Sequence, residues 1–351
     1  MLTPDSFTVK SHRGEYKVDF TTAGREEFLR QRQVRDILLV DKNVLATHGA
    51  RLSITDSPNL IEFDALERNK DLSMVPELVE RILQKGVTKR TRLVVVGGGI
   101  TQDMGAFAAS MIFRGIEWVF FPTTLLAQGD SCVGSKTSIN VGFRKNQVGN
   151  FNPPSQVVID PEFIETLPLR DIHSGCGEII KVHLLNGQLE RIEKEFHLSF
   201  TDKRVRMSLI ESSLKIKKWY IEQDEFDVGV RNLLNYGHTF GHALESATNF
   251  EIPHGLAVTA GMDIANFISW KQGLISEGMF YRIRQLLQSN FPDQEFGREL
   301  VGKFVDALRT DKKNVGGKLT AILTRGPGKM EKVQLSFDQQ LVKLIESYEE
   351  A

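Results

Sequence analysis

The sequence predicts an α/β domain with a mostly parallel sheet, followed by a mainly α-helical domain. At 351 residues, the chain is too long for one domain of the usual size. In its first half, short β-branched runs alternate with helical stretches, which is typical of an open parallel sheet. After about residue 160, helical periodicity takes over and clear strands become scarce. We therefore predict domains at residues 1–160 and 161–351, with the ligand site in the cleft between them.

The predicted strands of the first domain each end at a residue of chemical interest. Buried strands are expected at residues 37–40, 93–96 and 118–121. The first ends at Asp41, the second continues into a run of three glycines, and Pro122 ends the third. The intervening helices are expected at residues 76–85 and from about Asp103. The apolar side of the first of these helices is predicted to carry Val79, Ile82 and Leu83.

Composition excludes several classes of protein. A formal net charge of -1 gives no reason to expect nucleic acid or an anionic membrane surface as a partner. Cys132 and Cys176 have no metal-ligand spacing and form no disulfide framework, which suits a reducing cytoplasm. Charges interrupt the first thirty residues, and no apolar stretch reaches the roughly 20 residues that span a bilayer. We expect a cytoplasmic protein that neither crosses nor binds a membrane.

The glycine run Gly97-Gly98-Gly99 is a candidate phosphate site. Glycines let the backbone approach a phosphate, and the helix that follows offers unpaired N–H groups at its positive end. Tight packing explains such a run equally well, and the run is not the G-x-G-x-x-G fingerprint. Asp41 could bind a ribose hydroxyl, although an Asp that closes a strand is more often a turn former.

A histidine cluster is the stronger chemical signal. His238 and His242 are four residues apart, so they lie on one face of a helix. His254, between Pro253 and Gly255, lies near a turn that could return to this pair. Such a group suits a metal ion or an anionic substrate, with Glu178 as a candidate carboxylate ligand. Core or solvated histidines remain the alternative at this point.

Basic residues near glycines and small polar residues suggest an anionic substrate. Any one of them is more often a solvated surface residue, and composition alone does not decide between the two. The set consists of Lys136, Lys145 beside Asn146, Lys181, Lys217, Arg231, Lys312 and Lys313.

Taken together, these segments resemble the 3-dehydroquinate synthase family, over a range from Asp41 to about Lys318. They match in order and in spacing, which makes the resemblance specific. The matching segments are residues 97–103, 113–115, 122–128, 130, 136–137, 145–146, 174–175, 178–181, 234–242 and 254–255.

The resemblance implies a dinucleotide-binding N-terminal domain that takes NAD, and a divalent metal, usually zinc with cobalt as an alternative. The implied metal ligands are Glu178, His238 and His254, whereas His242 would face the substrate. One carboxylate and two imidazoles leave coordination positions open for substrate hydroxyls. The implied cofactor-binding residues are Asp41, Glu67, Lys70, Gly97, Gly98, Gly99, Asp103, Thr123, Thr124, Lys145 and Thr166.

The family reaction, as the resemblance implies it, converts 3-deoxy-D-arabino-heptulosonate 7-phosphate to 3-dehydroquinate and phosphate in the shikimate pathway of aromatic amino acid biosynthesis. A hydroxyl is oxidised transiently by NAD, phosphate is eliminated, the ketone is reduced, and an aldol step closes the ring. Lys217 and Arg231 would bind the substrate carboxylate, and Asp130 and Lys181 would lie beside its hydroxyls. The phosphate would be held by Lys136, Asn146, Asn235, His242, Lys312 and Lys313, with Arg114 contributed across a homodimer.

Three positions depart from the family pattern. Ser135 replaces a glycine, Gly177 replaces an alanine before Glu178, and Leu256 replaces an acid that could orient a ligand. The alternatives are therefore a sister cyclase acting on sedoheptulose 7-phosphate or glucose 6-phosphate, a metal-dependent polyol dehydrogenase, and an inactive binding module. Those sister substrates lack a carboxylate, so their enzymes do not need both Lys217 and Arg231. The dehydrogenases lack the lysine-rich pocket, and the full set of metal and cofactor residues argues against an inactive protein.

Overall fold

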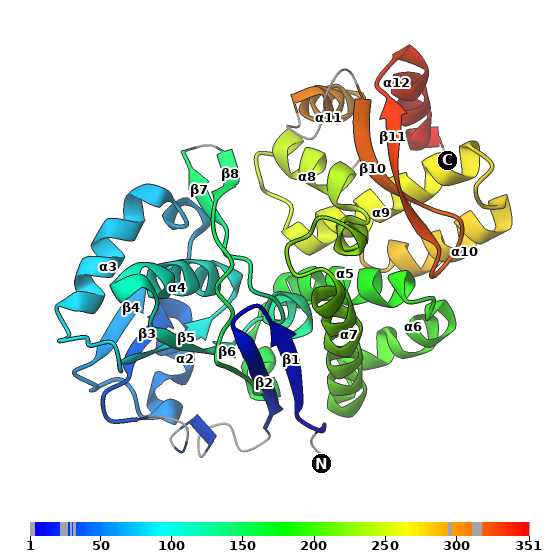
Figure 1. Cartoon of the computed structure of the whole chain (residues 1–351). Helices are drawn as coiled ribbons and strands as arrows, with labels where there is room; N and C mark the ends of the chain where they lie inside the picture. The colour runs from blue at the N-terminus through cyan, green and yellow to red at the C-terminus, as the bar shows by residue number, and fades with distance from the viewer. Residues whose placement is uncertain are drawn as a thin grey trace. The chain divides into compact units, whose positions relative to one another are not determined.

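The computed structural model describes residues 4–21, 27–28, 30, 33–142, 144–293, 297–310 and 318–350 (Figure 1). The chain divides into two compact units. The first comprises Met1–Pro168 and Lys217–Phe226, and the second comprises Leu169–Ile216 and Asp227–Ala351. The division between Ile216 and Lys217 falls inside one helix, α7 (Lys203–Gln223).

The first unit is built on a seven-stranded sheet with the order β1-β2-β9-β6-β5-β3-β4. Neighbouring strands are parallel except for the antiparallel hairpin of β1 and β2. This confirms the predicted mostly parallel sheet. The strands are β1 (Phe7–Ser11), β2 (Gly14–Phe20), β3 (Ile37–Asp41), β4 (Leu60–Phe63), β5 (Arg92–Gly97), β6 (Glu117–Pro122) and β9 (Gln156–Ile159).

Helices cover both faces of this sheet, which is why its central strands are apolar without alternation. On one face, Leu38 and Val40 of β3 pack in a core with Val44 of α2 (Lys42–Leu52). Their neighbour in sequence, Leu39, points to the other face, towards Gly105 of α4 (Gly99–Met111). Since side chains alternate along a strand, one continuous apolar run supplies both cores.

The order of the strands creates a switch point between β3 and β5. From β3 the chain passes through α2 to β4 on one side, and then crosses to β5 on the other side. From β5 it continues outward through α4 to β6. Loops at the carboxyl ends of β3 and β5 therefore diverge, and such a crevice is where parallel sheets bind nucleotides. The carboxyl ends of these two strands carry Asp41 and Gly97.

One predicted helix face is wrong in part. Helix α3 (Val75–Leu83) buries Val75, Leu78 and Ile82, whereas Leu83 is 45% exposed. The buried residues are separated by three and four positions, which places them in one stripe, and Leu83 follows that stripe by about 100°. The sequence pattern located the helix and the buried side of Ile82, but it assigned Leu83 to the wrong side.

The second unit is mainly helical and is organised around α9 (His254–Lys271), which is buried along nearly its whole length. The other helices are α5 (Leu169–Leu185), α6 (Leu189–Glu195), α8 (His238–Ala247), α10 (Glu277–Gln288), α11 (Arg298–Thr310) and α12 (Gln339–Glu346). An antiparallel hairpin of β10 (Lys318–Thr324) and β11 (Met330–Ser336) packs against α9 (Figure 1). The sequence pattern did not predict this hairpin.

Shorter elements connect these helices and strands. A small hairpin in the first unit is formed by β7 (Ile139–Val141) and β8 (Arg144–Val148), and a π-helical turn spans Ala127–Ser131. Turns of 3-10 helix occur at Glu67–Asn69, Leu72–Met74, Ile112–Arg114, Pro161–Thr166, His197–Phe200, Val230–Asn235 and Ser347–Glu350.

Candidate functional site

The carboxyl ends of β3, β5 and β6 form the first part of the site, within the first unit. Asp41 ends β3 and caps α2, because its Oδ1 accepts a hydrogen bond of 2.8 Å from Asn43 N. Burial raises the pKa of the Asp41 carboxyl, although the hydrogen bonds from the start of α2 oppose this effect. Thr123 follows β6, and its N–H donates to Gly97 O over 3.0 Å. The turn-forming role considered for Asp41 is therefore real.

The three glycines have different reasons to lack a side chain. A Cβ at Gly97 would lie 2.5 Å from Thr101 Oγ1, and one at Gly98 would lie 2.9 Å from Thr124 Cγ2. Packing within the chain thus requires the first two glycines. A Cβ at Gly99 would have no atom nearer than Ser131 Oγ at 3.9 Å. Gly99 opens helix α4, so this free space lies at a helix N-terminus, where an anion such as a pyrophosphate is stabilised.

Other predicted cofactor residues of the first unit form one polar network. Lys70 Nζ lies 3.0 Å from Asp103 Oδ2 and donates to Asn146 Oδ1 over 2.9 Å. Asp103 Oδ1 accepts a hydrogen bond of 2.9 Å from Ser138 N. Burial raises the pKa of Asp103, although the Lys70 ammonium opposes the rise. The network thus connects two predicted cofactor residues to Asn146, which was predicted for the substrate phosphate.

A second branch of the network holds Glu67 and Lys145. Asn140 Nδ2 donates to Glu67 Oε1 over 2.8 Å, and Lys145 Nζ lies 3.9 Å from the same oxygen. Asn140 Oδ1 accepts from Asn146 N over 2.9 Å, which joins the two branches. Sequence reasoning missed Asn140, because a lone amide in a short strand gives no local signal of its partners.

Thr166 lies apart from this network, at the end of the turn that follows β9. Its Oγ1 lies 2.8 Å from His48 Nε2, a buried imidazole of α2. Burial, together with Arg51, lowers the pKa of His48, so the ring is neutral near pH 7.

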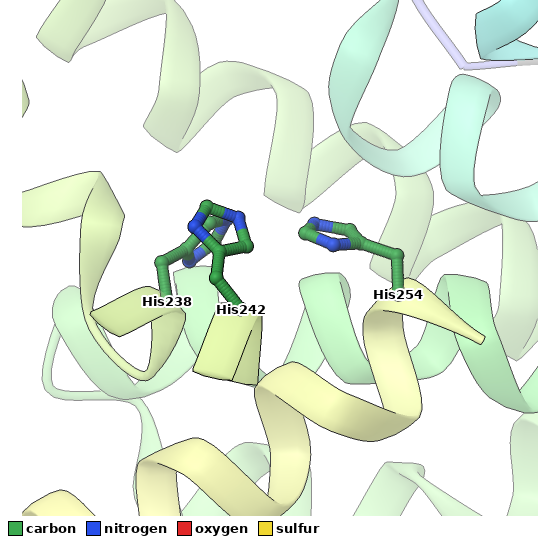
Figure 2. A group of neighbouring side chains, drawn as sticks. All are labelled: His238, His242 and His254. Carbon is green, nitrogen blue, oxygen red and sulfur yellow. The ribbon is translucent and has the colours of Figure 1, made fainter. Parts of the chain in front are cut away.

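In the second unit, three imidazoles converge. Figure 2 shows His238 and His242 from α8 facing His254 from α9. Ligand atoms of the three rings all lie within 4.8 Å of one another. His238 opens α8 and His254 opens α9, so both rings project from helix starts, while the spacing of four residues brings His242 alongside His238.

Glu178 of α5 lies against two of these rings. Its Oε1 is 3.2 Å from His254 Nε2 and 3.6 Å from His238 Nε2, and Lys181 forms an ion pair with its Oε2. The carboxylate is 1% exposed, and neither oxygen accepts a well-aligned hydrogen bond from the residues that the structure describes. Burial raises the pKa of Glu178, but Lys181 and the two imidazoles outweigh it and hold this pKa well below its usual range. An ionised, buried carboxylate facing imidazole nitrogens fits a divalent cation.

The Nδ1 atoms of His254 and His238 each lie near an oxygen atom of the protein. His254 Nδ1 lies 3.4 Å from Glu245 Oε2, and His238 Nδ1 lies 3.3 Å from Tyr236 O. Burial lowers the pKa of His254, but contacts with Glu178 and Glu245 outweigh it and raise this pKa to about 10. Partners of this kind orient the rings of metal-binding histidines. Sequence reasoning missed Glu245, although its position seven residues after His238 places it on the same face of α8.

Close helix packing accounts for Gly177, one of the three departures. A Cβ at Gly177 would lie 2.0 Å from Gly255 O, and one at Gly255 would lie 1.7 Å from Ser174 O. Helices α5 and α9 therefore approach through bare backbone at the residues next to Glu178 and His254. At the second departure, Leu256 is buried, and Glu245 is the acid that contacts His254.

The predicted substrate residues are divided between the units. In the first unit, Lys217 Nζ donates to Asp130 O over 2.7 Å and lies 3.0 Å from Asp130 Oδ1. Arg114 occupies a turn in which it has a φ of 67°, followed by Gly115 with a φ of 124°. Lys136 forms an isolated bridge with Phe151.

In the second unit, the 3-10 turn Val230–Asn235 carries two of the predicted substrate residues. Arg231 is buried, and Asn235 Nδ2 donates to Asn232 O over 3.1 Å. Lys181, buried beside Glu178, lies one helical turn from it on α5. Lys312 and Lys313 lie outside the described residues.

The chain was compared with family models, with the sequences of curated proteins and with solved structures. The family models for the 3-dehydroquinate synthase N-terminal and C-terminal domains match residues 60–174 and 175–314. The 3-dehydroquinate synthase of Alkaliphilus metalliredigens is 36% identical over 319 residues, which cover 89% of each chain.

Within the described residues, no helix has the length and apolar character needed to cross a membrane.

Two solved structures share the fold over nearly the whole chain. A 2-deoxy-scyllo-inosose synthase, complexed with carbaglucose-6-phosphate, NAD+ and Co2+, has a TM-score of 0.84 at 24% identity, covering 99% of this chain and 100% of its own. A 2-epi-5-epi-valiolone synthase from Streptomyces hygroscopicus subsp. jinggangensis, with NAD+ and Zn2+ bound, has a TM-score of 0.79 at 25% identity and covers 95% of both chains.

Proposed function

The chain belongs to the 3-dehydroquinate synthase family, and we propose that it performs the family reaction with NAD and a divalent metal held by Glu178, His238 and His254. It is an enzyme, a carbon–oxygen lyase that converts 3-deoxy-D-arabino-heptulosonate 7-phosphate to 3-dehydroquinate and phosphate. The single observation that supports the metal site most strongly is the buried Glu178 carboxylate, which faces two imidazole nitrogens.

Zinc is our proposal for the metal. Nitrogen and carboxylate ligands suit Zn2+, and a related cyclase structure contains it. A divalent ion held by these three residues would polarise substrate hydroxyls and favour their deprotonation. His242 lies beside the ligand rings, and we assign it to the substrate phosphate, with Lys181 beside the hydroxyls.

NAD is proposed to bind at the switch point of the first unit. The free space at Gly99 and the N-terminus of α4 suit its pyrophosphate, and Asp41 at the end of β3 is assigned to a ribose hydroxyl. NAD bound there would supply a hydride acceptor for the carbon that bears a substrate hydroxyl, and it would be regenerated within the same turnover. The remaining residues proposed for this site are Glu67, Lys70, Gly97, Gly98, Asp103, Thr123, Thr124, Lys145 and Thr166.

The substrate carries a carboxylate and a phosphate, and we propose separate sets of residues for them. Lys217 and Arg231 bind the carboxylate, and Asp130 lies beside the hydroxyls. Lys217 Nζ and Asp130 Oδ1 lie 3.0 Å apart, which supports their assignment to neighbouring groups of one substrate. The residues proposed for the phosphate are Lys136, Asn146, Asn235, His242, Lys312 and Lys313, with Arg114 from the second copy of a homodimer.

We further propose a cytoplasmic enzyme of the shikimate pathway that acts on small anionic molecules and has no nucleic acid or membrane partner. The even balance of charge and the two buried, unpaired cysteines support this proposal.

Phosphate release tests the proposed chemistry. The purified protein should release phosphate from 3-deoxy-D-arabino-heptulosonate 7-phosphate with substoichiometric NAD, and NADH should not accumulate. Stoichiometric NADH would favour a polyol dehydrogenase. Release from sedoheptulose 7-phosphate alone would favour a sister cyclase.

Arg231→Ala sharpens the distinction between these substrates. Loss of a charge-assisted contact with a carboxylate should lower kcat/KM by about ten- to a hundredfold. A sugar phosphate without a carboxylate should be affected much less. Equal losses for both kinds of substrate would contradict the carboxylate assignment.

A further inference from the structure

Two carboxylates at the end of α7 bind the free edge of the large sheet. Lys10 N donates to Glu222 Oε1 over 2.8 Å, and His12 N donates to Glu225 Oε2 over 2.7 Å. Strand β1 is the edge strand, and its hairpin closes with Ser11 opposite Gly14. The N–H of Lys10 therefore points away from β2 and needs a partner outside the sheet. Residues 217–226 belong to the first unit, so this contact lies within that unit.

Glu225 makes more of these contacts than Glu222. Its Oε1 accepts a hydrogen bond of 2.6 Å from Ser11 Oγ and lies 3.0 Å from His12 Nδ1. Burial raises the pKa of the Glu225 carboxyl, but hydrogen bonds from Ser11 and His12 outweigh it and lower this pKa below its usual value. One charged group thus contacts two residues of the hairpin tip.

The loop that carries Lys136 also contains Ser135, a residue by which this chain departs from its family, and it contacts the hairpin tip through Asn152. Ser135 O accepts a hydrogen bond of 2.7 Å from Asn152 N. Arg13 Nη1, from the hairpin tip, donates to Asn152 Oδ1 over 2.6 Å.

An aromatic contact connects the same region in addition to these hydrogen bonds. Phe226, the residue after Glu225, packs edge-on against Phe151 with ring centroids 4.9 Å apart. Phe151 is the residue that bridges Lys136. Lys136 is therefore connected to the hairpin tip through Ser135 and Asn152, and to the residue after Glu225 through Phe151.

The same stretch of chain carries Lys217 at its other end. Lys217 lies on α7, and its ammonium is held on Asp130. A helix is stiff over this length, so fixing its end against β1 restrains the backbone from which Lys217 projects.

We infer that Glu225 is a positioning residue, which holds Lys217 and Lys136 at one fixed spacing. The inference rests on the proposed function, in which these two cations bind the carboxylate and the phosphate of one substrate. A substrate charged at both groups must match that spacing, and a displaced lysine makes a weaker contact with its anionic group, which raises KM. Glu225 acts through the two lysines and does not itself touch the substrate.

Glu225→Gln is the direct test, because it keeps the shape of the side chain. The amide is neutral, so the charge-assisted hydrogen bonds to Ser11 and His12 are replaced by weaker ones. We expect KM for 3-deoxy-D-arabino-heptulosonate 7-phosphate to rise about tenfold, with kcat within about threefold of wild type. Amide exchange over residues 7–14 should become faster, and metal affinity, measured against a chelator, should not change.

Glu211→Gln is the matched control. It removes a carboxylate from α7, where Glu211 pairs with Lys215 at 2.6 Å. Kinetics and amide exchange over residues 7–14 should both stay at the wild-type level.

Ser11→Ala removes one hydrogen bond to the same carboxylate and carries the test if Glu225→Gln fails to fold. It should raise KM about two- to threefold. If amide exchange over residues 7–14 becomes faster in the folded variants while KM is unchanged, Glu225 only stabilises the sheet edge. That result would overturn the inference. A fall in kcat with unchanged KM would overturn it as well.

Failure of the proposed function is distinguishable from failure of this inference. A wild type that releases no phosphate from the carboxylate substrate contradicts the function. Inorganic phosphate titrated into wild type and Glu225→Gln then decides the inference. Weaker binding by the variant supports a displaced Lys136, and equal binding overturns the positioning role.

Discussion

Among single residues, the burial of Glu178 has the largest chemical consequence. A carboxylate that is 1% exposed must be neutralised, and Lys181 supplies one ammonium on one side. The imidazoles of His238 and His254 face its other oxygen, so this oxygen and two imidazole nitrogens can bind one cation. Removal of one ligand from this group should have a large effect on metal binding.

We predict that His238→Ala abolishes metal binding and activity together. Loss of one of three ligands should lower metal affinity by at least about a hundredfold. The thermal midpoint of the metal-free protein should change little. His197→Ala is the control, because His197 is an exposed imidazole on a 3-10 turn. Elemental analysis after dialysis gives the metal content, and a variant that retains metal but loses activity would contradict the ligand assignment.

Glu245→Gln should weaken metal binding without abolishing it. The side chain contacts His254 Nδ1 and orients the ring, and loss of such partners typically costs about ten- to a hundredfold in affinity. Competition with a chelator measures the affinity, and the absorption spectrum of the Co2+ form reports the ligand geometry. Glu251→Gln, at an exposed position near the end of α8, is the matched control. Unchanged affinity and spectrum in Glu245→Gln would show that His254 is held by packing alone.

Among the helices of the second unit, close approach of backbones determines where the ligands project. Gly177 on α5 and Gly255 on α9 allow contact between the two helices beside Glu178 and His254. On α8, a Cβ at Gly241 would lie 3.0 Å from Ala257 O of α9. Small residues at these crossings bring three ligand-bearing helices together, which larger side chains would keep apart.

Gly177→Ala tests this packing. The added methyl group would lie 2.0 Å from Gly255 O, which is backbone and cannot rotate away. We expect the variant to lose about 1–3 kcal/mol of unfolding free energy and to bind metal more weakly. Gly302→Ala on α11 is the control, because a Cβ there would meet no atom within 4 Å. That substitution should stabilise the protein by up to about 1 kcal/mol, since alanine favours the helix. Urea titrations measure both, and equal stability of the two variants would contradict the close crossing.

At the scale of the whole molecule, stability depends on groups buried in one protonation state. His183 of α5 is fully buried, with Nδ1 lying 2.8 Å from Ile179 O. Burial lowers the pKa of His183 from 6.5 to about 4, with Arg191 as a further cause and the Ile179 contact opposing. The unfolded chain therefore takes up this proton at a higher pH than the folded protein does.

We predict that His183 makes the protein sensitive to acid. Its contribution to stability is complete above pH 6.5 and is lost as the pH falls towards about 4. The loss should reach about 3 kcal/mol over that range. His183→Gln should flatten this part of the profile, and His197→Gln should leave it as in wild type. Urea unfolding of the metal-free protein from pH 4 to pH 7 gives the comparison, and parallel profiles for wild type and His183→Gln would refute the assignment.

Local patterns predicted the elements that carry the site. Runs of β-branched residues located β3, β5 and β6, and the spacing of His238 and His242 placed both rings on one face of α8. These predictions succeeded because strand and helix periodicity depend on neighbours in the chain. Local patterns did not predict the β10–β11 hairpin, because its strands are stabilised by pairing with each other and by packing on α9.

The sequence by itself determined the fold class, the family and the residues from which a metal and cofactor site can be built. Only the tertiary structure decided which of them meet. It pairs Lys217 with Asp130, places Glu245 behind His254, and joins Lys70 to Asp103 and Asn146. The physical reason is separation along the chain: these partners come from different elements. Whether they touch depends on how closely helices and strands pack, which glycines such as Gly177 and Gly255 control and which no local pattern records.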